Sequence, residues 1–262
     1  VLFRRPAWEI ARIYCRLSPS GIEALSEILV PFKYAKGDVV LPEGDICKHM
    51  YFVERGMVRQ YYYKNGRDVT EHFSYEGRIV VCIESFLKQS RLIVEALENS
   101  HLFGIPYDEL HELADQNKEI ELLFRKIMEH ALISSQIYAD SQRFENATER
   151  YLRLLNTKPE ILLRAPMLHI ASYLQMSPET LSRVRAAHLT EEIEKERSKK
   201  EQIEAQKAEY LKADTLKSDH KSVKTDSSLK SETAKSEGRN RTRENEKDEG
   251  EDAGVKNKKS AE

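Results

Sequence analysis

The chain has 262 residues, a net charge of −2 at pH 7, 40% hydrophobic and 33% charged residues, and a mean hydropathy of −0.63. This near balance of charge excludes a globally basic nucleic-acid-binding protein, although a local basic face can still contact phosphates. No apolar run is long enough to span a membrane and no signal segment opens the chain, so we expect a cytoplasmic protein with no membrane partner.

The cysteines stand far apart, at Cys15, Cys47 and Cys82, with no CxxC spacing. This usage fits a reducing compartment and gives no iron–sulfur or zinc pattern. The histidines are also spread without metal-ligand spacing. We therefore expect no cofactor and no metal site.

Two helices are predicted first, at residues 7–15 and 19–29, and Ser18-Pro19 supplies the cap and first turn of the second. The chain then breaks into short β-rich runs separated by turn residues. These runs are residues 39–41, 49–54, 57–63, 68–73, 78–83, 91–97 and 101–105. Asn65-Gly66 between two of them is typical of a two-residue hairpin. The pattern predicts a small antiparallel barrel or roll.

A short helix is expected after Pro106, and a longer one from about Lys118 to Arg143. The mainly apolar positions of the longer helix recur at alternating steps of three and four. They are Ile120, Phe124, Ile127, Ala131, Ser134 and Tyr138. Such a 3.5-residue seam is typical of helix pairing, so we expect it to meet a partner helix while one face covers the roll. The pattern leaves open a single helix that lies on its own domain.

After a further helix at residues 147–155, Pro159 and Pro166 indicate a short, stiff connection. Residues 167–189 then predict two short helices joined by a tight turn, in which Ser177 caps the second helix and Pro178 fits its first position. The seam between the two helices is expected to hold Ile170, Leu174, Met176, Leu181 and Val184.

This layout is that of a helix-turn-helix, whose second helix enters the DNA major groove, but a buried helical hairpin of another domain has the same pattern. The outward face of the second helix favours DNA binding because its polar side chains can reach bases and phosphates. They are Glu179, Thr180, Ser182, Arg183 and Arg185.

From Thr190 onward about half of the residues are charged, and pairs such as Glu191 with Lys195 can support a charged helix. Beyond about Asp214 the chain becomes rich in Ser, Lys, Glu and Asp, so we expect it to be disordered.

These residues resemble the cyclic-AMP receptor protein/fumarate-nitrate regulator (Crp/Fnr) family of bacterial transcription factors, most closely the branch found in Bacteroidetes. The likeness spans about residues 7–189. Its first part is a glycine-punctuated strand pattern at residues 37–38, 43–45, 50–53 and 56–58. Its second part, Glu179-Thr180-Leu181-Ser182-Arg183, is similar to the recognition helix of the fumarate-nitrate regulator branch.

The resemblance implies an α+β fold: N-terminal helices and a double-stranded β-roll sensor at residues 1–117, a dimerisation helix at 118–145 and a helix-turn-helix domain at 146–189. A charged helical, then disordered, tail follows at 190–262. It implies a transcriptional regulator and not an enzyme, acting as a homodimer on a two-fold-symmetric operator in double-stranded DNA and contacting RNA polymerase.

Residue by residue, the resemblance places Glu179, Ser182 and Arg183 against base edges, and Ser177 and Thr180 against phosphates. Chemistry agrees, since a guanidinium bonds bidentately to guanine and a carboxylate accepts from cytosine N4. We infer from its position that Arg185 also contacts the backbone. The alternative for Glu179 and Arg183 is a surface ion pair at i,i+4.

In cyclic-AMP-binding members a Gly-Glu pair and an Arg-Ser pair hold the ribose and phosphate of the nucleotide. Here the Gly-Glu pair is missing, Glu84 is displaced by one residue, and Ser90-Arg91 has the reverse order. Ser134, Ser135 and Gln136 fall where those members place hydroxyls against the base. We therefore expect a small-molecule effector pocket that is vestigial or retuned, with Glu84, Ser90, Arg91 and Ser135 as its candidate residues.

Two other functions fit parts of the pattern. A ligand-binding sensor that signals through a protein partner without binding DNA would need the same roll, but the Glu179-xx-Ser182-Arg183 face favours DNA. A metal-dependent enzyme on a β-barrel would need clustered His and carboxylate ligands, and the sequence has no His-x-His.

Overall fold

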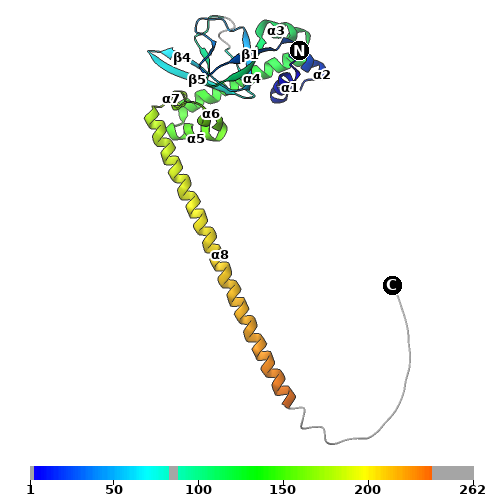
Figure 1. Cartoon of the computed structure of the whole chain (residues 1–262), viewed down its shortest axis with the longest axis vertical. Helices are drawn as coiled ribbons and strands as arrows, with labels where there is room; N and C mark the ends of the chain where they lie inside the picture. The colour runs from blue at the N-terminus through cyan, green and yellow to red at the C-terminus, as the bar shows by residue number, and fades with distance from the viewer. Residues whose placement is uncertain (1–2, 83–87, 238–262) are drawn as a thin grey trace, which may run out of the picture. The chain divides into compact units, whose positions relative to one another are not determined.

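The computed structural model describes residues 3–82 and 88–237, with side chains described for the same residues up to 208 and for Tyr210. The chain divides into two compact units, residues 1–190 and 191–262, and each is described by itself. In the first unit two helices precede a set of strands, and further helices follow it (Figure 1). The first two helices are α1 (Arg4–Tyr14) and α2 (Pro19–Ile28).

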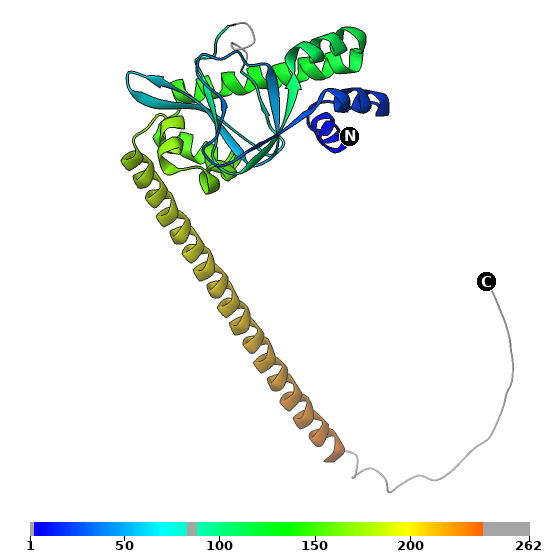
Figure 2. The ribbon, with the colours of Figure 1, turned by 45° about the horizontal axis from the view of Figure 1, so that its top comes forward.

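The strands lie close to the predicted runs. They are β1 (Val30–Tyr34), β2 (Val39–Leu41), β3 (His49–Arg55), β4 (Met57–Lys64), β5 (Arg67–Tyr75), β6 (Ile79–Val80), β7 (Ile93–Ala96) and β8 (Ser100–Pro106). They pair antiparallel in two four-stranded sheets, β1-β8-β3-β6 and β2-β7-β4-β5. Val53 and Leu102 of one sheet share a buried cluster with Val58 and Val94 of the other. The predicted roll is confirmed (Figure 2).

The hairpin and one edge of the roll show how local chemistry sets the strands. Asn65 and Gly66 both have positive φ, 52° and 74°, and join β4 to β5 as predicted. Strand β1 was not predicted, because Pro31 lies inside it. Since β1 is an edge strand that pairs only with β8, the missing N–H of Pro31 costs the sheet little.

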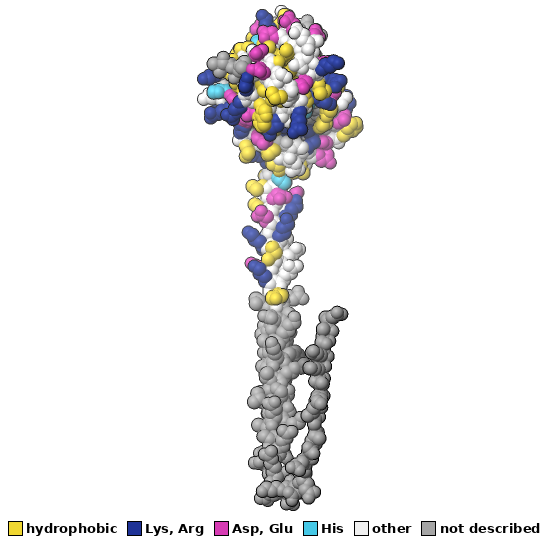
Figure 3. Space-filling model, turned by 90° about the vertical axis from the view of Figure 1, so that its right-hand side faces the viewer, with side chains coloured by type: hydrophobic (Ala, Val, Ile, Leu, Met, Phe, Trp, Pro, Cys, Tyr) yellow, Lys and Arg dark blue, Asp and Glu magenta, His cyan; other side chains and the backbone are white. Residues whose placement is uncertain are grey.

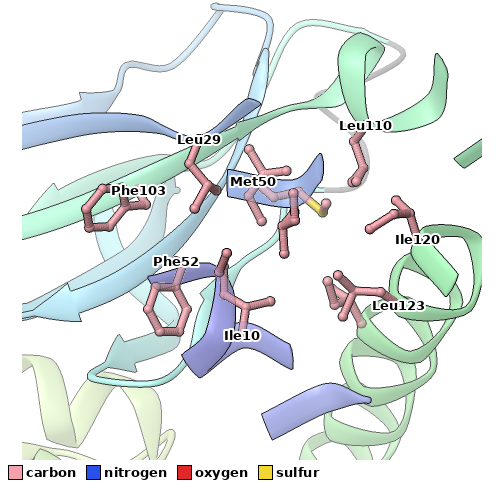
Figure 4. Close-up of a cluster of buried hydrophobic side chains, with 12 residues drawn as sticks. Ile10, Leu29, Met50, Phe52, Phe103, Leu110, Ile120 and Leu123 are labelled. Carbon is pink, nitrogen blue, oxygen red and sulfur yellow. The ribbon is translucent and has the colours of Figure 1, made fainter. Parts of the chain in front are cut away.

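Helices α3 (Tyr107–Gln116) and α4 (Lys118–Phe144) follow the roll. In Figure 4, Ile120 and Leu123 of α4 point toward Ile10 and Met50, in one buried cluster with residues of α1, β3 and β8. Ile127 also belongs to this cluster and is 2% exposed. The seam predicted for a partner helix is therefore wrong at Ile120 and Ile127, which face the protein's own core.

The same helix leaves other apolar side chains in solvent further along. Leu132 is 59%, Ile133 55%, Ile137 53% and Phe144 79% exposed. The described part of α4 thus has two different halves: the first covers the roll, and the second carries an uncovered apolar stripe.

Three short helices come next: α5 (Ala147–Thr157), α6 (Pro159–Arg164) and α7 (Met167–Tyr173). The connection predicted between the prolines is instead helix α6, because Pro159 stands at its first turn, where a missing N–H is tolerated. These helices share a buried cluster with roll residues such as Phe73 and Tyr75. They are therefore packed on β5 and its neighbours.

Helix α8 runs from Pro178 to Glu237, past the predicted end near Asp214. That prediction was too short, because no Gly or Pro interrupts the sequence after Pro178 until Gly238. Beyond Thr190 its described side chains are exposed, and Figure 3 shows charged groups of both signs on the face of the helix in view. In the part of the chain that the structure describes, no helix is long and apolar enough to cross a membrane.

Candidate functional site

The turn between α7 and α8 is built by local hydrogen bonds. Gln175 adopts a left-handed conformation with φ of 51°, which lets the chain reverse within a few residues. The Ser177 hydroxyl accepts from the backbone N–H of Thr180 at 3.2 Å, and the Ser177 carbonyl accepts from Leu181 N–H at 3.0 Å. Ser177 thus caps α8, as its sequence position predicts.

The seam between the two helices is apolar and closed. Ile170, Leu174 and Leu181 are at most 1% exposed, and Met176 and Val184 pack against them at half-buried positions. Ala171, also buried, allows the close crossing. Leu168, by contrast, is 62% exposed and takes no part in the seam.

The opposite side of α8 presents the predicted polar residues. Ser177, Glu179, Ser182, Arg183 and Arg185 are exposed, and Thr180 is half-buried. The structure therefore brings together the residues expected to contact DNA.

The alternative of a Glu179–Arg183 ion pair does not occur among the described residues. Arg183 instead donates from Nη2 to the Thr180 hydroxyl at 3.5 Å, a weak bond. The pKa of Glu179 lies below its usual value. The causes are a hydrogen bond from the Ser177 hydroxyl, a hydrogen bond from the backbone N–H of Glu179 itself, and the charge of Arg183. Glu179 is therefore a carboxylate at neutral pH, and the Arg183 guanidinium has donors to offer.

A buried cation, Arg59, connects helix α7 to the roll, and it was not predicted from the sequence. Arg59 of β4 is 4% exposed. Its guanidinium donates to Glu95 at 3.0 Å and to Asp68 at 2.9 Å, and lies 3.7 Å over the ring of Tyr61. It also meets Nδ1 of His169 on α7 at 2.8 Å. We call Arg59, Asp68, Glu95 and His169 the Arg59 cluster.

The contact fixes the chemical state of His169. A guanidinium can only donate, so Nδ1 of His169 must accept and the ring must be neutral. Burial and the adjacent Arg59 lower the pKa of His169 accordingly. Ser172 adds a second tie: its hydroxyl accepts from Thr70 N–H and donates to the Asp68 carbonyl, each at 2.9 Å.

The candidate effector residues do not gather around one cavity among the described residues. Glu84 lies outside them. The Ser90 hydroxyl is buried and bonds within its own loop, to the carbonyl and N–H of Leu92 at 2.8 and 3.0 Å. Arg91 pairs with Glu71 at 3.6 Å, and Ser135 is exposed on α4. Within the described ranges no group of three or more His, Cys, Asp or Glu side chains could hold a metal ion.

Comparison with known proteins supports the fold. The family model described as cyclic nucleotide-binding domain matches residues 31–117. FixK2 from Bradyrhizobium japonicum superposes with a TM-score of 0.56 and 21% identity, covering 63% of this chain and 87% of that one. The c-di-GMP-responsive global regulator CLP of Xanthomonas campestris gives 0.52 and 18% identity, over 66% of this chain and 93% of that one.

A further solved structure, from Eubacterium rectale and assigned to the Crp/Fnr family of transcriptional regulators, gives a TM-score of 0.52 and 16% identity, over 72% of this chain and 88% of that one. Comparison with curated proteins gives no match. At these identities the likeness shows the fold: a roll of the cyclic nucleotide-binding type within a chain arranged like those regulators.

Proposed function

We propose that this protein is a DNA-binding transcriptional regulator of the Crp/Fnr type that binds a two-fold-symmetric operator as a homodimer. In this proposal residues 1–117 sense, 118–145 dimerise and 146–189 bind DNA. The observation that carries it is the exposed polar face at the start of α8, which stands on a closed apolar seam and offers Arg183 without an ion-pair partner among the described residues.

The recognition helix is the first part of α8, residues 178–188. Arg183 donates to guanine, Glu179 accepts from cytosine and Ser182 reaches a neighbouring base edge. Ser177, Thr180 and Arg185 contact phosphates. The alternative, a sensor that signals through a protein without DNA, leaves this face without a use.

A second copy covers the exposed stripe of α4. Ile133, Ile137, Asp140 and Phe144 follow each other at steps of four, three and four, and all four are exposed. This is the spacing of a paired helix, with Asp140 as the one polar position among the apolar residues of the seam. The stripe replaces Ile127 as the expected dimer contact.

Selection of bound DNA from a random library tests the proposal. We expect a palindromic consensus, and Arg183→Ala should weaken binding to it by roughly 1–3 kcal/mol and relax one base per half-site. Arg197→Ala, on the same helix beyond the recognition segment, is the matched control and should keep the consensus. Recovery of no consensus, or an unchanged one with Arg183→Ala, would contradict the assignment.

The dimer is tested with the double variant Ile133→Glu/Ile137→Glu, measured by sedimentation velocity. Two charges in the apolar seam should give monomers and abolish tight operator binding, since a half-site alone holds few contacts. Leu163→Glu, at a side chain that is 83% exposed on α6, is the control and should remain dimeric. A dimeric double variant would show that the interface lies elsewhere.

A further inference from the structure

A cavity of about 310 Å³ opens between the roll, helix α4 and the junction of α5 with α6. Aromatic and aliphatic side chains of β5 and α4 form much of its wall. Its polar lining includes Gln60, Arg78, His130, Ser134 and Lys158. Its volume falls in the range of small-molecule sites, which combine an apolar wall with a few placed polar groups.

No carboxylate compensates the charge of this cavity, although the Arg78 guanidinium lies 5.6 Å from the centre of the Tyr75 ring. No Asp or Glu side chain lines it, and among the described residues neither Arg78 nor Lys158 forms an ion pair. Buried or half-buried cations are normally paired, because their desolvation is costly. We call Arg78 and Lys158 the cation pair.

The neighbouring groups respond to this positive field. Burial, followed by Arg78 and Arg153, lowers the pKa of Lys158. Burial and Lys158 lower the pKa of His72, which also lines the cavity, to about 4. Burial, Arg78 and Lys158 lower the pKa of His130. The histidines are therefore neutral at pH 7 and the charge rests on the cation pair, whereas Arg153 is already paired with Glu145.

We propose that this cavity binds a small organic anion, with its carboxylate or phosphoryl group held by Arg78 and Lys158 and its body against the apolar wall. The assignment rests on the proposed function, because it names the effector class of that regulator. Ser134 and Gln60 supply further hydrogen-bonding groups on the wall.

The site differs from the loop that the sequence pointed to. Ser90 and Arg91 do not line the cavity, and both have partners within the protein. Of the two adjacent serines on α4, Ser134 lines the cavity and Ser135 does not. In this proposal the anion is held by Arg78, directly before β6, and by Lys158 at the α5–α6 junction, not by the loop around residue 90.

The position of Lys158 connects the site to the DNA-binding helices. Lys158 is the single residue between α5 and α6, and Leu154 and Ile161 on either side are buried in the cluster that includes Ile170 and Leu181. An anion that draws Lys158 toward Arg78 therefore acts on the helices that carry α7 and α8.

Titration calorimetry on the full chain tests the site at ionic strength held constant with chloride. The probes are inorganic phosphate, phenyl phosphate, benzoate and the neutral benzyl alcohol. Comparing phenyl phosphate with benzoate separates recognition of a phosphoryl group from recognition of a carboxylate. We expect saturable binding of at least one organic anion, more tightly than inorganic phosphate, and none of benzyl alcohol. Arg78→Gln and Lys158→Gln should each weaken it by roughly 10- to 100-fold, the usual effect of losing a charge-assisted bond.

Lys158→Arg, which keeps the charge, should retain most of the affinity, and the exposed-site double variant Lys33→Gln/Arg55→Gln should bind as the parent does. Circular dichroism confirms that each variant is folded. Absence of saturable anion binding, equal binding by the Gln variants and their control, or equal binding of benzyl alcohol would each overturn the assignment. The DNA selection is run separately, once without anion and once with saturating anion. A protein that selects an operator but binds no anion refutes the cavity alone, whereas one that binds the anion but selects no operator in either run refutes the proposed function alone.

Discussion

The first unit contains two sites at which an arginine of the roll lies near the helices that follow it. The two sites differ in whether carboxylates surround the cation. In the Arg59 cluster the cation is almost fully buried and has Asp68, Glu95 and His169 around it. Arg78 and Lys158 both line the cavity, where no carboxylate accompanies them, and the charge of Arg78 contributes to the lowered pKa of Lys158. A cation that the protein compensates itself holds the fold together, whereas one that it leaves uncompensated is available to a ligand.

The largest effect is expected at the compensated site. Arg59→Met keeps an unbranched apolar stem but removes the guanidinium, which leaves Asp68 and Glu95 without their cation and Thr70 and His169 without their donor. Breaking a buried ion pair from one side is strongly destabilising, so the free energy of unfolding should fall by roughly 3 kcal/mol. Chemical denaturation measures it. The exposed Lys33→Met is the control and should change stability little; an equal loss in both would remove the distinction between the sites.

Acid should weaken both sites, through histidines whose pKa values lie below the ordinary value of 6.5. His72 is the clearest case, at about 4. Between pH 4 and 6.5 the His72 side chain of the unfolded chain binds a proton, whereas that of the folded chain does not. The free energy of unfolding is therefore highest above pH 6.5 and falls as the pH drops toward 4. From pH 7 to 5, His72 alone should cost roughly 2 kcal/mol, at about 1.4 kcal/mol per pH unit below 6.5.

The histidine variants separate the two sites. His72→Gln should remove part of the acid loss at the cavity, and His169→Gln part of that at the Arg59 cluster, since an amide oxygen can accept from Arg59 at any pH. A bound anion should reduce the acid loss through His72 but not through His169. His101→Gln, on β8, is the control. Unfolding curves from pH 5 to 8 measure all three, and a parent protein equally stable at pH 5 and 7 would contradict the mechanism.

The roll was predictable because its information is local. The turn at Asn65-Gly66 and the strand at residues 39–41 occur in the structure where the sequence predicts them. Strand β1 was not predicted because it contains Pro31, which is tolerated there because β1 is an edge strand. Periodicity on α4 found the apolar positions but could not say which side they face. Ile127 has the spacing of a seam residue, yet the roll that it covers comes from residues far away in the chain.

The sites divide in the same way. The face from Ser177 to Arg185 lies on one helix, so the spacing was enough to find it. The Arg59 cluster joins residues more than a hundred positions apart, and nothing in the strand sequence around Arg59 distinguishes it from an exposed residue. The cation pair likewise joins Arg78 to Lys158. The Bacteroidetes-like branch and the contact with RNA polymerase stay predictions from the sequence.

The smallest effect is expected at the uncompensated site, and its sign is the opposite of that at Arg59. Lys158→Gln removes one of two mutually repelling charges and a desolvation cost, so without ligand the free energy of unfolding should stay equal or rise by up to about 1 kcal/mol. A given concentration of organic anion should raise the Tm of the parent more than that of the variant, since the variant binds the anion more weakly and a ligand stabilises only the state that binds it. Thermal unfolding with and without anion measures both. A clear loss of stability in the ligand-free variant would mean that Lys158 holds the α5–α6 junction as Arg59 holds α7, and the two sites would then be alike.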